Sequence, residues 1–231
     1  MSNKFNNELK LVEILKALKI DNVIRFNASL GSISSPEKPE ANSICEYIKG
    51  PLPTKMEGLI LLVAEEIQGF DCIVVDSPKL KMIDLINYIK TTVGFIEQYK
   101  NICIPESVLI GKNVVIEDNV SIGENTIIEH NVVLNSGTKI GENCIICSNS
   151  CIGGEGYSFI EHEGRLISVP SIGGVKIGND VEIGYNCTIS KGNINDTHIA
   201  DNVKFDGETV FMGYEALQAT AKVVALYIDG K

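Results

Sequence analysis

Three histidines are the side chains of this sequence best suited to moving a proton near neutral pH. They are His130, His162 and His198. An ordinary imidazole titrates at about pH 6.5, so it can take a proton from an attacking amine and return it to a leaving group. Each histidine also has a plain structural interpretation, since a polar histidine often only forms a wall hydrogen bond or faces solvent.

A glycine-rich segment offers a second kind of chemistry. Residues 153–171 read GGEGYSFIEHEGRLISVPS. Backbone N–H groups around Gly153, Gly154 and Gly156 are candidates to hold an oxyanion or a thioester, with Tyr157 lining the cavity. The same glycines could serve only to turn the chain, and both interpretations stay open.

Cysteines and histidines do not form the pattern of a metal site. The seven cysteines are an odd number, and Cys144, Cys151 and Cys187 lie within apolar repeats, which favours buried, reduced thiols. Cys144 and Cys147 are explained as wall residues of the same repetitive run. A metal-dependent hydratase would need converging histidines, two of them close in sequence, but the three histidines are 32 and 36 residues apart. We therefore predict no metal site.

An aliphatic residue at every sixth position organises the second half of the chain. This period fits neither a helix nor a long alternating strand, but it fits a solenoid of short extended segments joined by corners. Three segments would make one triangular coil with the aliphatic side chain pointing inward. The repeated positions are Ile104, Ile110, Ile116, Ile122, Ile128, Leu134, Ile140, Ile146, Ile152, Ile177, Ile183, Ile189, Ile199, Phe205 and Phe211.

Two further sets of residues support the solenoid. Small or β-branched residues should also face inward; they are Val114, Val120, Thr126, Val132, Thr138, Cys144 and Ser150. Asparagines should occupy the corners, because asparagine tolerates the left-handed backbone that tight corners need. These are Asn113, Asn119, Asn125, Asn131 and Asn143.

The remaining segments complete the predicted domains. We expect a small α/β domain over 1–100, with strands at 59–63 and 72–75, a helix at 80–89 and a loop at 29–41. A parallel β-helix should cover 101–214, with 153–171 leaving it as an extruded loop and 191–198 as a shorter excursion. Helical spacing from Leu217 to Tyr227 predicts a closing helix over 215–231. The fold class is thus mainly β.

Charge and composition exclude several classes of partner. A net charge of −10 argues against nucleic acid, because such binders rely on clustered Lys and Arg. No segment has the length and apolar character of a membrane span, and the first residues lack the pattern of a secretory leader. We expect a cytoplasmic protein.

The chain resembles the hexapeptide-repeat acyltransferases, and among them the UDP-3-O-acylglucosamine N-acyltransferases of lipid A synthesis. The resemblance runs from Ile128 to Asp206. It rests on IIEHNV, GGEGYSF, VPSIGGVKIGNDVEIG, CTISKG and NDTHIADNVKFD. The first domain is similar more weakly, through its element order and DSPKLKMIDLI at 76–86.

This resemblance implies a left-handed β-helix and a homotrimer with active sites between subunits. The donor would be acyl-CoA or an acyl-carrier protein, used as a co-substrate with no permanently bound cofactor, and the acceptor a nucleotide-linked amino sugar. His130 lies in the repeat register of the family's base, so it is the predicted catalytic residue. Tyr47 falls near the family's ring against uracil, and His162 could reach a neighbouring subunit's site.

The sequence also departs from the family. Where the family has its base in an Ile-Ala-His-Asn unit, this chain has Phe211-Met212-Gly213-Tyr214, and Gly213 cannot take a proton. Ser190 and Lys191 replace an acidic-basic pair. A relative acting on another sugar in surface-glycan synthesis is one interpretation. A non-catalytic or decayed trimeric paralogue with a binding or scaffold role is the alternative.

Overall fold

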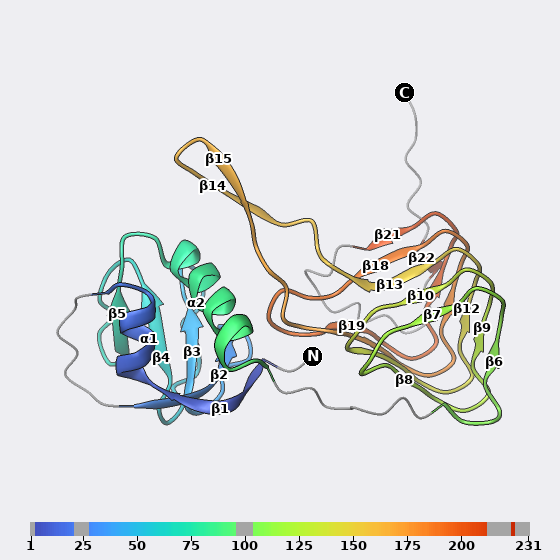
Figure 1. The fold of residues 1–231 in the computed structure, drawn as a ribbon, viewed down its shortest axis with the longest axis horizontal. Helices are drawn as coiled ribbons and strands as arrows, with labels where there is room; N and C mark the ends of the chain where they lie inside the picture. Colours follow the sequence, from blue (N-terminus) through green and yellow to red (C-terminus); the bar gives the residue numbers. More distant parts are fainter. Residues whose placement is uncertain (1–2, 21–27, 96–103, 212–222, 225–231) are drawn as a thin grey trace. The chain divides into compact units, whose positions relative to one another are not determined.

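The computed structural model describes residues 3–20, 28–95, 104–211 and 223–224. Backbone contacts divide the chain into two compact units. One unit contains residues 2–96 with 158–170, and the other contains 97–157 with 171–231. Figure 1 shows the elements of both units, which are described separately below.

The first unit is built on a five-stranded sheet in the order β1-β2-β3-β4-β5. The pair β1–β2 is antiparallel and the other pairs are parallel. Helix α2 contacts β3 and β4 and starts with a proline, whose fixed φ and missing N–H suit a first turn. The bounds are β1 (Lys4–Lys10), α1 (Leu11–Ala17), β2 (Ser29–Ser34), β3 (Ser43–Glu46), β4 (Ile60–Val63), β5 (Asp71–Val74) and α2 (Pro78–Thr92).

The predicted loop over 29–41 is wrong for its first part, because residues Ser29–Ser34 form the inner strand β2. Three serines interrupt the apolar pattern of SLGSIS, although Leu30 and Ile33 are fully buried. The Ser34 hydroxyl is also buried, and it is 2.7 Å from the Ser43 hydroxyl on β3. Paired hydroxyls can therefore occupy the interior of this sheet without an unsatisfied polar atom.

Three parallel sheets form the second unit as a β-helix, as the six-residue period predicts. Strand partners lie 18 residues apart, as in Val115 with Val133 and Ile127 with Ile145. One coil therefore contains three hexapeptides. The sheet orders are β21-β18-β13-β10-β7, β19-β16-β11-β8 and β22-β20-β17-β12-β9-β6.

The strands of the β-helix are short and joined by corners (Figure 1). Their bounds are β6 (Leu109–Ile110), β7 (Val115–Ile116), β8 (Ser121–Ile122), β9 (Ile127–Ile128), β10 (Val133–Leu134), β11 (Thr138–Ile140), β12 (Ile145–Ile146), β13 (Cys151–Gly154), β16 (Val175–Ile177), β17 (Glu182–Ile183), β18 (Thr188–Ser190), β19 (Thr197–Ile199), β20 (Lys204–Phe205), β21 (Val210–Phe211) and β22 (Val223–Val224).

The core of this unit consists of the predicted inward columns, except that Ile110 in the first coil is 42% exposed, because no earlier strand of its sheet covers it. In one sheet the paired residues are Ile128, Ile146, Ile183 and Phe205, all buried. The second set of inward positions is also buried from Val120 to Ser150. Thr126 satisfies its hydroxyl by donating to the Gly141 carbonyl at 2.9 Å and accepting from the Cys144 N–H at 3.1 Å.

Asparagines occupy the corners with positive φ, as predicted. Asn113, Asn119, Asn125, Asn131 and Asn143 have φ between 56° and 63°. Their side chains also stack between coils, since the Asn131 amide donates to Asn149 at 3.1 Å and accepts from Asn113 at 3.2 Å. Asparagine at these corners thus tolerates the left-handed backbone and also forms hydrogen bonds to the neighbouring coils.

The two interruptions change the spacing between strand partners. Ile140 pairs with Ile177, 37 residues on, which is 19 more than one coil. Within this insertion β14 (Phe159–His162) and β15 (Arg165–Ser168) form an antiparallel hairpin. Ile177 pairs with Ile199 at 22 residues, so the second excursion adds four.

The predicted closing helix does not extend through Val223 and Val224. These two residues form β22, which pairs in parallel with β20 and lengthens the sheet. Two consecutive β-branched residues favour a strand, and the open edge of a sheet offers a partner for it. The rest of the segment 215–231 lies outside the described residues, as does Gly213. In the described part of the chain, no helix is long and apolar enough to cross a membrane.

Candidate functional site

The root of the hairpin is fixed to the β-helix by a polar cluster. Lys191 Nζ lies 2.7 Å from Glu155 Oε1, and the lysine side chain is only 9% exposed. Glu155 Oε2 also accepts the Ser171 N–H at 3.2 Å. The Ser171 hydroxyl in turn donates to Asn193 Oδ1 at 3.2 Å. One carboxylate therefore joins the outgoing strand of the insertion to its returning strand and to the next coil.

The predicted binding glycines have different roles at this root. Gly153 has a φ of 83°, and a Cβ there would lie 2.5 Å from Thr138 Oγ1, so only glycine can make this turn. Gly154 pairs with Ser190, and its carbonyl accepts the Lys191 N–H at 2.9 Å. A Cβ on Gly156 would meet only ordinary contacts, the nearest at 3.6 Å from the Ser171 hydroxyl. Tyr157 is 77% exposed on the surface.

His162 lies at the tip of the hairpin, opposite Arg165. The two residues between them, Glu163 and Gly164, both have positive φ, at 49° and 72°. This is the backbone of a tight two-residue turn whose twist matches the strands. The sequence predicts that His162 projects from the solenoid, and the structure places it beside this turn.

His130 lies at an exposed corner after β9. Its Nδ1 accepts the backbone N–H of Lys112 at 2.8 Å, from the preceding coil. A neutral imidazole held this way carries its proton on Nε2, so the outward nitrogen donates a hydrogen bond. His130 can act on a substrate only through this nitrogen.

The structure does not bring the three histidines together. His130 is at the corner that follows β9, whereas His198 projects from β19 in a different sheet. Across the described ranges, no three His, Cys, Asp or Glu side chains converge in the manner of metal ligands.

A cavity of about 470 Å³ lies on the β-helix, and a second of about 540 Å³ lies on the first unit. Tyr47 lines the second one, together with residues that follow β4 and precede α2. The parallel strands β3, β4 and β5 all end here, which is where ligands bind in open α/β sheets. The Tyr47 ring packs against a cluster that includes Leu61 and Val63, and its hydroxyl donates to the Gly50 carbonyl at 2.6 Å.

Among the charged residues that line this second cavity, carboxylates outnumber cations. Glu65, Glu66 and Asp76 are acidic, and Lys79 is the single basic lining residue. Burial raises the pKa of nearby Glu46, while the Lys79 charge lowers it. Such a surface can accept hydrogen bonds from hydroxyl groups but repels phosphate. Sequence reasoning missed Glu65 and Glu66; their signal is an acidic pair directly after a buried strand.

The buried thiols are unsuited to act as nucleophiles. Burial, with a smaller contribution from Glu37, raises the pKa of Cys45 from 9.0 to about 12. Burial, followed by the charges of Glu129 and Glu182, raises the pKa of Cys147 to about 11. A thiol reacts as the thiolate, so these side chains remain inert at neutral pH.

Comparison with known proteins supports the repeat architecture. Residues 104–136 and 119–154 match the family model described as bacterial transferase hexapeptide (six repeats). A UDP-3-O-acylglucosamine N-acyltransferase of Leptospira biflexa is 48% identical over 58 residues, which are 25% of this chain and 16% of that protein. The enzyme of the same description from Pseudomonas putida is 49% identical over 57 residues, with the same two shares.

The matched segments span only 16% of the length of those curated relatives. The acetyltransferase domain of PglB from Neisseria gonorrhoeae in complex with acetyl coenzyme A aligns with 66% of this chain and 79% of its own, at 12% identity. The TM-score of this alignment is 0.29. The coils and the family match together show that residues 104–154 consist of hexapeptide repeats similar to those of the bacterial transferase model.

Proposed function

We propose that this protein transfers an acyl group from acyl-CoA or an acyl-carrier protein to the amino group of a nucleotide-linked amino sugar. The observation that carries the proposal is the hexapeptide-repeat β-helix, with its similarity to UDP-3-O-acylglucosamine N-acyltransferases over 58 residues. Surface-glycan or lipopolysaccharide synthesis is the class of process that uses such a product. The free thiols at all six cysteines described suit a reducing, cytoplasmic setting.

The reaction places two demands on the protein. The amine nitrogen attacks the thioester carbon and loses a proton, and the tetrahedral oxyanion then collapses with release of the thiol. Gly154, Gly156 and Tyr157 are the proposed contacts for the thioester, and His162 is a proposed substrate contact. A desolvated amine is already partly nucleophilic, so orientation can supply much of the rate.

His130 is the proposed catalytic histidine. With Nδ1 engaged by the Lys112 N–H, its Nε2–H is a donor that can stabilise developing negative charge on oxygen. A role as base would require the other tautomer and loss of the bond to Lys112. To accept a proton from the substrate, His130 would therefore have to give up its hydrogen bond with the Lys112 N–H.

The cavity at Tyr47 is the proposed nucleoside site. Its volume of about 540 Å³ is of the size that small-molecule sites have. Carboxylates at Glu65, Glu66 and Asp76 can accept hydrogen bonds from ribose hydroxyls. The diphosphate would lie away from these charges, nearer to Lys79.

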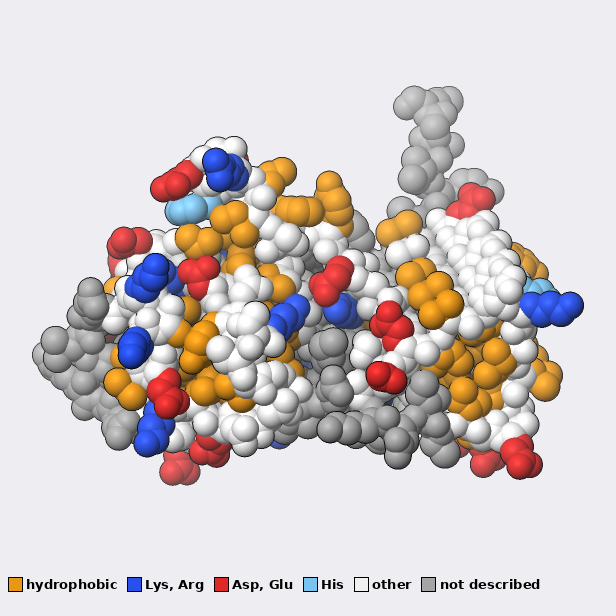
Figure 2. Space-filling view, in the orientation of Figure 1, with side chains coloured by type: hydrophobic (Ala, Val, Ile, Leu, Met, Phe, Trp, Pro, Cys, Tyr) orange, Lys and Arg blue, Asp and Glu red, His pale blue; other side chains and the backbone are white. Residues whose placement is uncertain are grey.

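Self-association, as a trimer of left-handed coils, is part of the proposal. The outward column of one sheet is largely apolar, with Val115 at 52% and Val210 at 57% exposure. Its register continues through Val133, Cys151 and Thr188. In a neighbouring sheet Leu109 is 62% exposed, and hydrophobic side chains gather on the β-helix in Figure 2. Exposed apolar faces of this kind mark protein contacts.

A panel assay tests the proposed reaction. The protein is incubated with acyl-CoA and acyl-carrier protein donors and with UDP- and dTDP-linked amino sugars, and N-acylated products are detected by mass spectrometry. We expect one acceptor to gain an acyl group with release of one thiol. Binding of nucleotide sugar without product from any donor would support the non-catalytic scaffold instead, a function favoured by the Phe211-Met212-Gly213-Tyr214 unit.

A further inference from the structure

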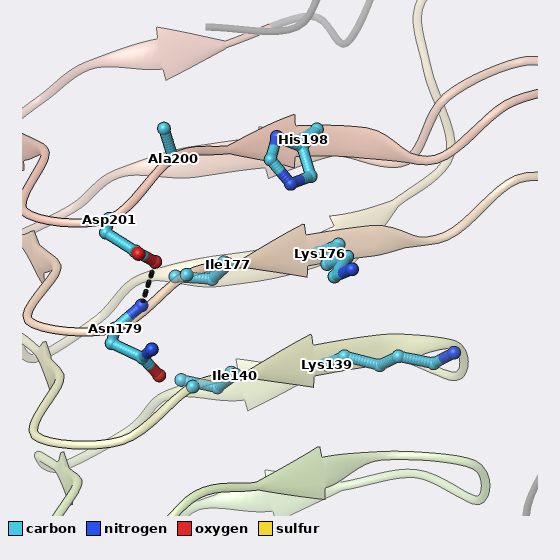
Figure 3. A pocket seen from close by; sticks show the side chains of 10 residues that line it. Lys139, Ile140, Lys176, Ile177, Asn179, His198, Ala200 and Asp201 are labelled. Atoms are coloured by element: carbon cyan, nitrogen blue, oxygen red, sulfur yellow. Dashed lines mark hydrogen bonds between the residues drawn. The ribbon is translucent and has the colours of Figure 1, made fainter. Parts of the chain in front are cut away.

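The third sheet of the β-helix carries a basic column on its outer side. Lys139 on β11 pairs with Lys176 on β16, and Lys176 pairs with His198 on β19. Figure 3 shows these side chains on three adjacent strands, one above another. Neighbouring strands lie about 4.8 Å apart, so Lys176 has Lys139 on one adjacent strand and His198 on the other.

Lys139 and Lys176 place two like charges at paired positions of adjacent parallel strands. Like charges directly opposite one another across strands are destabilising. Of the ion pairs between described residues, none involves Lys176 or His198. The outward columns of the other two sheets differ, since one is mainly apolar and the other pairs Lys204 with Glu182 at 3.7 Å. The basic column is thus a local feature of a protein whose net charge is −10.

The column also borders the cavity of about 470 Å³ on the β-helix. Its wall includes Ile140, Ile177 and Ala200 beside the three basic residues. The one carboxylate in the lining, that of Asp201, accepts the Asn179 N–H at 2.8 Å at the opposite end of the cavity (Figure 3). The basic side chains therefore border the cavity on one side, away from this carboxylate.

We propose that the column Lys139, Lys176 and His198 binds a phosphate ester. A phosphate group offers several acceptor oxygens and enough negative charge to offset neighbouring cations, and lysine binds it as a point charge. That this phosphate belongs to a substrate rests on the proposed function. The existence of the anion site does not, because it follows from the register of the three strands. Both coenzyme A and a nucleotide sugar could supply such a group.

Binding of inorganic pyrophosphate to the full chain, followed by titration calorimetry, tests the site without any catalytic assay. We expect Lys176→Gln to weaken pyrophosphate binding about tenfold, since a hydrogen bond to a charged group is lost. Lys204→Gln is the matched control: it removes one positive charge from another sheet and should leave binding unchanged. Equal weakening by both variants, or no binding by the unaltered protein, would overturn the proposal.

Competition then identifies the source of the phosphate. Displacement of pyrophosphate by coenzyme A assigns the column to the acyl donor, and displacement by UDP assigns it to the acceptor. If neither displaces it, the assignment to a substrate fails. The panel assay could show no acyl transfer while pyrophosphate still binds and Lys176→Gln still weakens that binding. This result would contradict the proposed function but support the anion site.

Discussion

Lys191 reaches from the coil after the extruded hairpin to Glu155 at the start of that hairpin, with 2.7 Å between Nζ and Oε1. The lysine side chain is 9% exposed and the glutamate 57%. The pair is therefore asymmetric: the cation is nearly buried and its partner is reached by solvent. This asymmetry makes the two possible truncations unequal.

Glu155→Gln should destabilise the protein more than Lys191→Met. The first change leaves a buried ammonium group without its carboxylate, whereas the second removes the charge and keeps the side-chain volume. Because water reaches Glu155, we expect a loss of about 2 kcal/mol for Glu155→Gln, below the cost of breaking a fully buried pair. Urea denaturation measures the difference, and faster hydrogen exchange at 158–169 would show a loosened hairpin. Equal losses for both variants would contradict the asymmetry.

Asn131→Ala should destabilise the β-helix more than Asn131→Gly. Asn131 has a φ of 58° and links two coils through its amide. Alanine loses the hydrogen bonds and also the tolerance of left-handed backbone, a cost of about 1–2 kcal/mol. Glycine loses only the hydrogen bonds. Thermal denaturation of the two variants gives the comparison, and a lower stability for the glycine variant would exclude backbone strain as the main term.

The repeat region was predictable because its signal is local. Each regular hexapeptide places one aliphatic residue inward and often an asparagine at a corner. The six-residue period can therefore be recognised in the sequence without knowledge of the coil geometry. The strand β2 was missed because its serines interrupt the apolar pattern and are satisfied only by β3, through Ser34 and Ser43. No local rule supplies that partner.

The site residues were less predictable because insertions shift the register. Lys139 and Lys176 are 37 residues apart, and Lys176 and His198 are 22 apart. Neither spacing is the 18 residues of a regular coil, so the basic column emerges only when the strands are paired. Glu65 and Asp76 likewise share a cavity because β4 and β5 end at the same edge of the sheet.

Substitutions at His130 separate a structural role from a catalytic one. In His130→Asn the amide oxygen can replace Nδ1 as the acceptor for the Lys112 N–H, while the group equivalent to Nε2 is lost. We expect His130→Asn to keep its thermal stability and to lose about 10²–10³ in kcat, the effect of removing an oxyanion donor. His130→Ala should lose both. Full activity of the asparagine variant would show that His130 has only a structural role, as the acceptor for the Lys112 N–H.

The pH dependence of the same variant tests the assigned tautomer. If Nε2 donates a hydrogen bond, the low-pH limb of the kcat/KM profile should remain in His130→Asn. If His130 is the base, the residual activity of the variant should no longer fall at low pH.

Alkaline pH should destabilise the first unit through Cys45. Burial raises the thiol pKa of folded Cys45 from 9.0 to about 12, so above pH 9 the unfolded chain releases a proton that the folded chain keeps. Stability is therefore constant below that pH and falls as the pH rises toward the folded pKa. From about pH 8 to about pH 10.5 the expected loss is about 2 kcal/mol. Chemical denaturation of the unaltered protein and of Cys45→Ala at both pH values isolates this contribution, because the variant should show a shallower decline.

Val133→Asp tests self-association through the apolar column. Val133 lies in that column between Val115 and Cys151, and it is half-buried whereas the next residue, Leu134, is buried in the core. A charge there should leave the fold intact but oppose burial against a second copy, because an unpaired carboxylate is costly to desolvate. Multi-angle light scattering should show a smaller species for Val133→Asp and an unchanged one for Ser121→Asp, which places the same charge on the sheet of the basic column. The proposed contact between copies through the apolar column would be wrong if the unaltered protein were monomeric. It would also be wrong if both variants dissociated equally.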